Sequence, residues 1–585
     1  MQPLSHQLSQ LFQDAFESAG MERRHGQVQP SGRPDLCQFQ CNGAMPAAKA
    51  AGLNPRQAAD KVLAQLQGHA AIKELSLAGP GFINITLTDA FLAGQAREAA
   101  ADPRQGVVLA AQPHKVVIDF GGPNVAKPLH VGHLRSAIIG DCLQRLHRFR
   151  GMEVVSDIHL GDWGTQMGML IEGVREEQPG LPYFDAEGAG PYPSVSPVSL
   201  EDLERLYPLV SARCKDDAVL SERARTATKD LQAGRPGYRA LWRHFVGVSV
   251  AEIRKDFGDL DVSWDLWLGE SDSQGGIPAM LADLATRGIS AASEGALVIH
   301  LDPIANTETP PLLLVKKDGG YLYGTTDLAT LRERVQAGAK RLLYVADKRQ
   351  SLHFAQVFQG AQKAGYLAGA TAEHVGFGTV NGKDGKPFKT RDGGVMRLQT
   401  LLAMALDEAA KRLAENQLGQ GLSAAEKQDV ARKVGYAAVK FADLSNHRAS
   451  DYAFDLEKFT QFEGKTGPYL LYAAVRMKSI QRKAAERGFS AGLLAEPGDF
   501  ERPLYLKLLA LPDALERAAS DSLPHVLCEY AFELAGAYST FYQNCSILHE
   551  EDPAKRGSWL ALTGHSLAVL ERVLGLLGIA APESM

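Results

Sequence analysis

The sequence predicts an α/β protein with a central parallel sheet, an α+β domain before it and an all-α helical bundle after it. Three observations support this fold class. Between residues 115 and 397, short apolar runs alternate with segments of helical period, which is typical of a parallel sheet covered by helices. The region before it combines two strand-like runs with two amphipathic segments, and nearly everything after it has a helical period.

Changes in composition along the chain predict the domain boundaries. A length of 585 residues is enough for about three to four domains. The stretch from Asp102 to Pro113 contains prolines, a glycine and polar residues, and predicts the first boundary. A stretch rich in Pro, Gly and Ser at 177–200, followed by helical periods, predicts an insertion at about 171–270. The expected domains are 1–110, 111–397 and 398–585.

Hydrophobic periodicity predicts the elements within these domains. In the N-terminal domain we expect helices at 4–19 and 55–67, and strands at 72–77 and 82–87 around the turn from Ala78 to Gly81. The strands expected in the central domain are 115–120, 153–158, 296–301, 312–315, 341–346 and 374–380. The helices expected in the C-terminal domain are 398–416, 424–446, 465–487, 503–518, 523–543 and 556–577.

Composition and charge narrow the class of protein. Hydrophobic residues make up 45% of the chain and charged residues 22%, as in ordinary globular proteins. No apolar stretch is long enough to span a membrane and no secretory signal is visible at the N-terminus, so we expect a cytoplasmic protein. The six cysteines form no Cys-x-x-Cys pair, which predicts reduced thiols and no zinc site. With a net charge of −6, binding of a nucleic acid would require local basic patches.

The segment from Pro123 to His133, PNVAKPLHVGH, is the most informative in the chain. It lies between a buried strand-like run and an apolar-periodic helix, so His130, Gly132 and His133 are expected at a strand-to-helix turn. A helix N-terminus offers free N–H groups and a positive dipole end to a phosphate, and glycine lets a ligand approach the backbone. Imidazoles can donate to phosphoryl oxygens and offset negative charge. Two histidines at this spacing are also common as ordinary surface or core residues, whereas the zinc-protease spacing His-Glu-x-x-His is not present in this segment.

These eleven residues resemble the His-x-Gly-His signature of class I aminoacyl-tRNA synthetases, and more specifically that of the arginyl-tRNA synthetases, including the lysine three positions before the first histidine. The resemblance implies a catalytic domain with a Rossmann-like, doubly wound parallel sheet. It also implies catalytic roles for Lys127, His130, Gly132 and His133, with ATP bound by both histidines.

A second segment, Gly382 to Gly394, is a glycine-rich cationic loop after a strand-like run. Loops at the carboxyl ends of parallel strands bind ligands, although this composition is also typical of a solvated hairpin. Class I synthetases have a Lys-Met-Ser-Lys-Ser loop at this place in the chain order, and only Lys389 and Thr390 match its second half here. The resemblance implies that Lys389 is catalytic, that Lys386 and Lys389 bind ATP, and that Lys127 compensates for the missing lysine. It leaves the division of work between Lys127 and Lys389 open.

A third segment contains Tyr323 and Asp327, four residues apart at a strand-to-helix turn. On its own, Asp327 is typical of a helix cap. A guanidinium pairs best with carboxylates, and the resemblance implies that Asp119, Tyr323 and Asp327 line a pocket for the arginine side chain. It also implies that Asn124 and Gln350 contact the amino and carboxylate end of the amino acid.

Further matches concern the ATP site and the flanking domains. The residues implied on the ATP side are Gly161, Asp162 and Phe377. The first two belong to a Gly-Asp-Trp-Gly-Thr-Gln run, whose role we interpret as mainly structural and near the adenosine. Residues 1–110 resemble the domain that the family uses on the tRNA elbow. The C-terminal helices resemble its anticodon-binding bundle, with Phe541 and Tyr542 expected to be exposed for stacking on unpaired bases.

The resemblance therefore implies an arginine–tRNA ligase, which joins L-arginine to the 3′ end of tRNA(Arg) through an arginyl-adenylate. The expected substrates are ATP, L-arginine and tRNA(Arg), with Mg2+ on the phosphates, no metal ligands from the protein and a monomeric state. The family generally activates arginine only when tRNA is present, and we expect the same here. Two alternatives stay open: a related nucleotidyltransferase that uses no tRNA, and a non-catalytic RNA-binding paralogue.

Overall fold

The computed structural model describes residues 2–33, 36–185, 188, 190–303, 307–317, 319–382, 385–386 and 396–585. The chain forms two compact units. The sheet unit comprises Ala111–Glu408 and Ala442–Lys458, and the bundle unit comprises Met1–Ala110, Ala409–Phe441 and Phe459–Met585. The unit boundaries fall after Ala110 and within the helices α13 (Leu398–Glu415), α14 (Ala424–Leu444) and α15 (Leu456–Phe459). The domain boundaries expected from the sequence stay predictions.

A four-stranded parallel sheet forms the centre of the sheet unit. Its strands are β5 (Lys115–Phe120), β6 (Glu153–Asp157), β10 (Ala339–Val345) and β11 (Thr371–His374), in the order β11-β10-β5-β6. Because β5 pairs in parallel with both β6 and β10, the strand order reverses beside it. All four strands end at the same edge, which is where open α/β sheets bind ligands. The predicted parallel sheet is confirmed in β5, β6 and β10.

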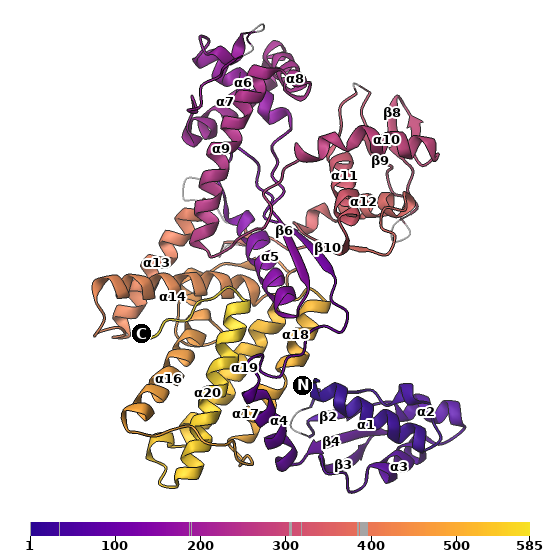
Figure 1. The fold of residues 1–585 in the computed structure, drawn as a ribbon, viewed down its shortest axis with the longest axis vertical. Helices are drawn as coiled ribbons and strands as arrows, with labels where there is room; N and C mark the ends of the chain where they lie inside the picture. Colours follow the sequence, from indigo (N-terminus) through magenta and orange to yellow (C-terminus); the bar gives the residue numbers. More distant parts are fainter. Residues whose placement is uncertain are drawn as a thin grey trace. The chain divides into compact units, whose positions relative to one another are not determined.

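Helix α5 (Val131–Phe149) packs closely on β5 (Figure 1). Its residues Leu134 and Ile138 are buried. At Gly140 a Cβ atom would come within 2.1 Å of the Phe120 ring. The missing side chain of Gly140 therefore sets the separation of helix and sheet, and so the place where α5 begins.

The insertion expected at about 171–270 is mainly helical. Its helices are α6 (Thr165–Glu177), α7 (Leu200–Asp216), α8 (Ala218–Gln232) and α9 (Pro236–Asp259), which form one group in Figure 1. After α9 the chain returns to the sheet, where Gly269 forms a parallel bridge with Leu160. Trp264 stacks on Phe120 with ring centroids 4.8 Å apart and donates its indole N–H to the Phe120 carbonyl at 2.9 Å. The segment from Trp264 to Gly269 thus continues the sheet edge beyond β6.

Two of the expected strands belong to a separate sheet. β7 (Ala291–Ser293), β8 (Ala296–Ile299) and β9 (Leu312–Val315) pair in that order and are antiparallel. Their assignment to the parallel sheet is wrong, because a short apolar run predicts a buried strand but not its partner. Ile299, Leu312 and Leu314 are buried against α10 (Ile277–Thr286), α11 (Tyr323–Gln336) and α12 (Ser351–Lys363).

The strand expected at 374–380 is interrupted. β11 ends at His374, Phe377 forms an isolated parallel bridge with Asp347, and β12 (Val380–Asn381) then pairs in parallel with β13 (Tyr452–Ala453). Gly378 passes so close to Ser450 that a Cβ atom would lie 2.5 Å from the Ser450 carbonyl oxygen. The chain therefore leaves β11 in order to pack against the segment before β13.

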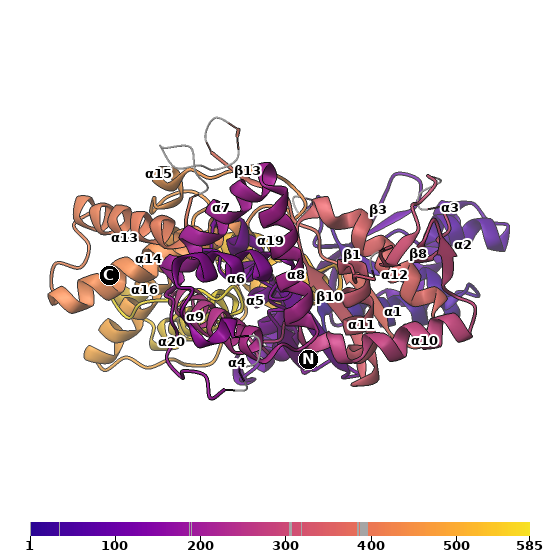
Figure 2. The ribbon, with the colours of Figure 1, turned by 90° about the horizontal axis from the view of Figure 1, so that it is seen from above.

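The bundle unit contains a small α+β part. Its strands are β1 (Val28–Pro30), β2 (Phe39–Cys41), β3 (Ile72–Ala78) and β4 (Phe82–Leu87), antiparallel in the order β1-β2-β4-β3. The helices α1 (Leu4–Ser18), α2 (Ala44–Ala51) and α3 (Pro55–Leu66) lie beside this sheet in both Figure 1 and Figure 2, and α4 (Asp89–Ala101) follows it. The two helices and two strands expected for this region are confirmed.

The remaining helices of the bundle unit are α16 (Gly467–Glu486), α17 (Arg502–Leu509), α18 (Leu511–Ser520), α19 (His525–Asn544) and α20 (Pro553–Leu576). The single helix expected at 503–518 is wrong, because the chain breaks at Ala510: Pro512 cannot continue α17 but suits the first turn of α18. Short 3-10 turns occupy Arg23–His25, Pro182–Phe184, Asp272–Gly275, Lys348–Gln350 and Ile547–His549. None of the helices in the described part of the chain is both long and apolar enough to cross a membrane.

Candidate functional site

The histidine turn, which comprises residues 121–133, begins where β5 ends. The chain first passes through Gly121 and Gly122. Their φ angles are +97° and +49°, which glycine adopts readily. The Ala126 N–H then donates to the hydroxyl of Ser249 at 3.0 Å. The turn is therefore held from two sides, by the end of β5 and by α9 of the insertion.

His130 and His133 cap the first turn of α5 with their own side chains. His130 is the N-cap residue, and its Nδ1 atom accepts a hydrogen bond from the Gly132 N–H at 3.0 Å. The Nδ1 atom of His133 accepts from the His130 N–H at 3.1 Å. The two rings stack with centroids 3.8 Å apart. Two histidines thus form the reciprocal capping box that serine and glutamate form in other helices.

This capping box sets the tautomer of both rings. An Nδ1 atom that accepts from a backbone N–H carries no proton, so the proton of each neutral imidazole lies on Nε2. Burial and the nearby Lys127 lower the pKa of His130, and burial together with His130 and Lys127 lowers the pKa of His133 to about 3. Both rings are therefore neutral at pH 7, and each offers one Nε2–H donor at a helix N-terminus that favours anions.

Gly132 has a structural role that the sequence did not indicate. A Cβ atom at this position would lie 2.8 Å from Cε1 and 2.9 Å from Nδ1 of His130. The missing side chain therefore lets the His130 ring fold back over the first turn of α5, in addition to leaving the backbone open to a ligand.

Asn124 and Gly161 lie together at the ends of β5 and β6. They form a parallel bridge, and a Cβ atom at Gly161 would lie 2.3 Å from Oδ1 of Asn124. The Gly161 carbonyl accepts the Val125 N–H at 3.0 Å and the Gln166 side-chain amide at 2.8 Å. The structure thus brings these two predicted site residues into contact, and glycine is required at 161 because Asn124 is so close.

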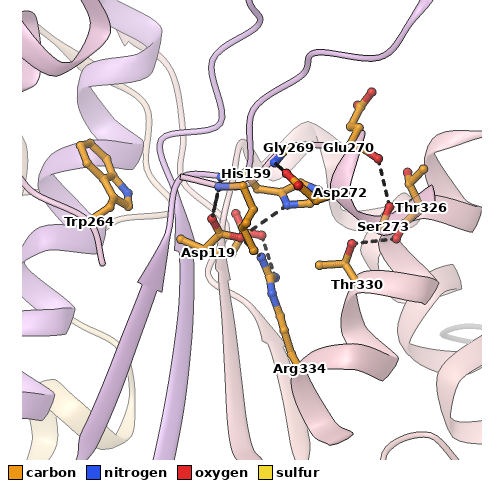
Figure 3. Close-up of polar contacts among 12 residues, drawn as sticks. Asp119, His159, Trp264, Gly269, Glu270, Asp272, Ser273, Thr326, Thr330 and Arg334 are labelled. Atoms are coloured by element: carbon orange, nitrogen blue, oxygen red, sulfur yellow. Dashed lines mark hydrogen bonds and ion pairs between the residues drawn. The ribbon is translucent and has the colours of Figure 1, made fainter. Parts of the chain in front are cut away.

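Asp119 faces an arginine of the protein itself. Nη1 of Arg334, on α11, lies 2.8 Å from the Asp119 carboxylate (Figure 3). Burial raises the pKa of Asp119, and the charge of Arg334 opposes that shift. The carboxylate to which the resemblance assigned a substrate guanidinium therefore already has a guanidinium partner in this structure.

Asp119, Asp157 and His159 also have the spacing of a metal site. Each offers a ligand atom, and these atoms lie within 4.8 Å of one another. Nη2 of Arg334 lies 2.7 Å from the Asp157 carboxylate, and the Arg334 side chain is only 10% exposed. A fixed, buried cation thus offsets both carboxylates, so this group does not suit a metal ion.

Asp327 lies among other charged groups at the start of α11. Nε2 of His353, on α12, lies 2.5 Å from its carboxylate. Burial and the charges of Asp162 and Asp327 raise the pKa of Glu270 to about 7. Partial burial raises the pKa of the Tyr323 hydroxyl, and the negative charges of Glu270 and Asp327 add to that shift. Two carboxylates that repel one another in a half-buried site favour a cation near both.

Glu270 is a candidate site residue that sequence reasoning missed. With Tyr323, Thr326 and Trp163 it lines a pocket of about 220 Å3. Its side chain points away from the Asp119–Arg334 pair (Figure 3). An isolated glutamate carries no sequence pattern, and the one available signal was its place directly after an apolar, tryptophan-containing run.

Asp162 supports the turn that carries Glu270. Its carboxylate accepts hydrogen bonds from the Ser271 N–H at 3.0 Å and from the Ser271 hydroxyl at 2.6 Å. Its carbonyl accepts the indole N–H of Trp242 at 2.8 Å, and the residue is 3% exposed. The structure thus gives Asp162 a supporting contact beneath the pocket.

Phe377 lies in the extended segment after β11. Its ring is buried, with the guanidinium of Arg135 5.9 Å from the ring centroid. Its N–H donates to the Ala346 carbonyl at 3.1 Å, and its carbonyl accepts the Lys348 N–H at 2.8 Å. The backbone polar groups of Phe377 are therefore already paired within the sheet unit.

The other predicted residues lie around the same edge of the sheet or outside the described residues. Lys127 is half-buried, 4.8 Å from the centroid of the Tyr207 ring. Gln350 is exposed at the start of α12. The carbonyl of Lys386 accepts the Gly382 N–H at 2.7 Å in a tight turn. The residues predicted from the loop that lie outside the described part of the chain are Lys389 and Thr390.

In the bundle unit, Phe541 and Tyr542 of α19 differ in exposure. Phe541 is fully buried with its ring 6.1 Å from that of Trp559, so the expectation that it is exposed is wrong. Tyr542 is 40% exposed. Adjacent helical residues point in different directions, so one of the pair joins the core. The Arg476 guanidinium lies 4.8 Å from the Tyr472 ring and 5.3 Å from the Tyr542 ring, and Arg476 and Tyr472 line a groove of about 360 Å3.

Comparison with known families gives three matches along the chain. The catalytic domain of the class I (R) tRNA synthetases matches residues 97–456. The arginyl-tRNA synthetase N-terminal domain matches residues 6–87, and the DALR anticodon-binding domain matches residues 470–585. The matched order is that of an N-terminal domain, a catalytic domain and a helical anticodon-binding domain.

Individual proteins are similar over the whole chain. Proteins named arginine–tRNA ligase from Hyphomonas neptunium and Maricaulis maris are 52% and 53% identical to it, with 100% of each chain covered. The solved structure of the arginyl-tRNA synthetase of Plasmodium falciparum superposes with a TM-score of 0.83 at 24% identity, again over 100% of both chains. At 24% identity, this structural similarity supports a shared fold and nothing further.

Proposed function

The chain belongs to the arginyl-tRNA synthetase family, and we propose how its residues act as an arginine–tRNA ligase. In the first step, the carboxylate of arginine attacks the α-phosphorus of ATP, which forms arginyl-adenylate and releases pyrophosphate. In the second step, a ribose hydroxyl at the 3′ end of tRNA(Arg), the 2′-hydroxyl in class I enzymes, attacks the adenylate carbonyl and AMP leaves. The observation that carries the proposal is the pair of imidazole donors at the start of α5, at the edge where the strand order reverses.

The two histidines stabilise the charge that develops on the phosphates. A carboxylate nucleophile is ionised at pH 7, so the first step needs alignment and charge stabilisation rather than a general base. Donors that are already oriented cost no reorganisation when charge develops. The Nε2–H groups of His130 and His133 are oriented in this way because their Nδ1 atoms accept from the Gly132 and His130 N–H groups.

Lysines supply the positive charge that neutral imidazoles lack. Lys127 lies close enough to lower the pKa of both histidines, so its ammonium is near the same phosphate site. Lys386 and Lys389, from the loop after β12, are proposed to bind the ATP phosphates on the other side. Gly161, Asp162 and Phe377 are proposed for the adenosine side, while the hydrogen bonds of Asp162 with Ser271 hold the turn that carries Glu270.

The arginine side chain binds between the carboxylates of Asp327 and Glu270, with Tyr323 beside them. This pair carries a mutual repulsion that a guanidinium removes. Asp119 acts less directly, since Arg334 occupies its carboxylate and thereby holds α11 against β5. The residues proposed for the amino and carboxylate end of arginine are Asn124 and Gln350.

Mg2+ is proposed to arrive with ATP, held by phosphate oxygens and water. The one described group with metal-ligand spacing is paired with Arg334 and does not fit a cation. When bound, Mg2+ offsets phosphate charge, and the residues named above orient the reactants.

The bundle unit is proposed to bind tRNA. The groove beside Tyr472 and Arg476 offers an aromatic face and a guanidinium to unpaired bases. A monomeric state and a cytoplasmic location are part of the same proposal.

Charging of total tRNA with each of the twenty amino acids tests the function. We expect label from arginine alone, and only when ATP is present. Charging with another amino acid would contradict the pocket. Pyrophosphate release without tRNA charging would favour the nucleotidyltransferase, and tRNA binding without pyrophosphate release would favour the RNA-binding paralogue.

A further inference from the structure

Helix α7 of the insertion contacts two cations, one within the histidine turn and one beside it. The Glu204 carboxylate lies 2.9 Å from Nη2 of Arg397. Three residues further on, the centroid of the Tyr207 ring lies 4.8 Å from Nζ of Lys127, within the range of a cation–π contact. Because residues three apart lie on the same face of a helix, one face of α7 meets both cations.

The contact with Arg397 anchors α7 to the histidine turn. The chain around Arg397 runs beside the start of α5, where Val131 donates its N–H to the Met396 carbonyl at 3.1 Å and Leu398 donates to the Leu129 carbonyl at 3.0 Å. Arg397 itself forms an antiparallel bridge with His130. The position of Tyr207 is therefore set relative to the same backbone that positions the two imidazoles.

The Lys127 side chain has room to move. Its backbone is fixed because the Ala126 N–H donates to Ser249, but the ammonium ends a flexible four-carbon stem. Among the residues that the structure describes, no carboxylate lies within ion-pairing distance of it. Lys127 lines a cavity of about 530 Å3 whose other walls include Glu252 and Asp256. An unrestrained ammonium could turn toward these carboxylates and away from the phosphate site.

We propose that Tyr207 is a positioning residue for Lys127, holding its ammonium at the phosphate site while arginine is activated. An aromatic face suits this task because it attracts the cation without neutralising it, whereas a carboxylate would offset the charge that acts on ATP. This role rests on the proposed function, since it requires that Lys127 act on ATP.

A double-mutant cycle on the full chain tests this role. The variants are Tyr207→Leu, Lys127→Ala and the double variant, and the readout is the rate of arginine-dependent, tRNA-supported adenylate formation at saturating ATP and arginine. Loss of a cation–π contact should lower the rate about threefold to thirtyfold in Tyr207→Leu. Tyr207→Phe keeps the ring and should recover most of that rate. In the Lys127→Ala background, Tyr207→Leu should have little further effect, because the ring then has no ammonium to hold.

Leu209→Ala is the matched control, because Leu209 is exposed on the same helix and should leave the rate unchanged. Thermal unfolding of each variant checks the fold, and Tyr207→Met replaces Tyr207→Leu if the latter does not fold. A wild-type rate in the variants without a ring, a loss in Tyr207→Phe as large as in Tyr207→Leu, or losses that multiply in the double variant would each overturn the role. A wild-type protein that does not activate arginine would instead overturn the proposed function, before any variant is compared.

Discussion

Replacing Glu270 by glutamine should remove the pH dependence of arginine binding near neutrality. Burial and the charges of Asp162 and Asp327 raise the pKa of Glu270 to about 7, so its ionised form is lost as the pH falls through 7. A guanidinium stays charged throughout this range and binds the ionised carboxylate. Because about nine tenths of the group is ionised at one pH unit above its pKa and about one tenth at one unit below, the wild-type KM for arginine should be roughly tenfold higher at pH 6 than at pH 8.

In Glu270→Gln the charge is absent at every pH. The KM for arginine should therefore change little between pH 6 and pH 8. At pH 8, the loss of a charge-assisted partner should weaken arginine binding by about 1.5–3 kcal/mol. The KM for ATP should change much less, because the pocket beside Glu270, Tyr323 and Thr326 lies apart from the proposed phosphate donors.

Steady-state aminoacylation at several pH values, with arginine and ATP varied in turn, measures these quantities. Asp302→Asn is the charge-matched control, since the Asp302 side chain is 72% exposed and pairs with Lys363. A wild-type KM for arginine that does not change from pH 6 to pH 8 would show that the Glu270 carboxylate does not bind the arginine guanidinium. So would a Glu270→Gln protein that keeps the wild-type pH dependence.

Three further predictions concern the same site. Asp327→Asn should cost about 2–5 kcal/mol in the use of arginine and far less in the use of ATP, and unchanged arginine kinetics would remove Asp327 from the pocket. His133→Ala should slow adenylate formation about a hundredfold to a thousandfold with little change in tRNA affinity. A near-normal rate would mean that the His133 ring only caps the helix. Arginine-dependent exchange of labelled pyrophosphate into ATP should require tRNA, because tRNA binding energy orders the incomplete lysine loop, and full exchange in tRNA-free protein would contradict this.

Local pattern was enough to predict much of the fold. The apolar runs at β5, β6 and β10 are continuous and bounded, so their strands and their parallel arrangement were predicted, and the fold class is confirmed. Pattern did not identify the partners of β8 and β9, because a short buried strand looks the same in a parallel and an antiparallel sheet. The break at Ala510 was readable in principle from Pro512, but the apolar period continues across it.

In the candidate site, too, features built from contiguous residues were predictable, and contacts between distant residues were not. The histidine turn was predicted from contiguous residues, whereas the capping box was not, because histidine is an unusual residue at both of its positions. The pairing of Asp119 with Arg334 joins residues far apart in the chain, and one sequence carries no signal for it. Glu270 and Tyr207 reach the site only through the fold of the insertion, so neither could be selected from the sequence alone.

The proposed chemistry depends on two neutral imidazoles at the start of α5 with their protons on Nε2. Nitrogen NMR of the histidine-labelled protein measures the tautomer of each ring, with His130→Ala and His133→Ala used to assign the signals. We expect an unprotonated Nδ1 in both rings at pH 7 and a His133 ring that stays neutral well below pH 6, since its pKa is lowered to about 3. A proton on Nδ1 of either ring, or a His133 imidazolium at pH 6, would contradict the proposed chemistry.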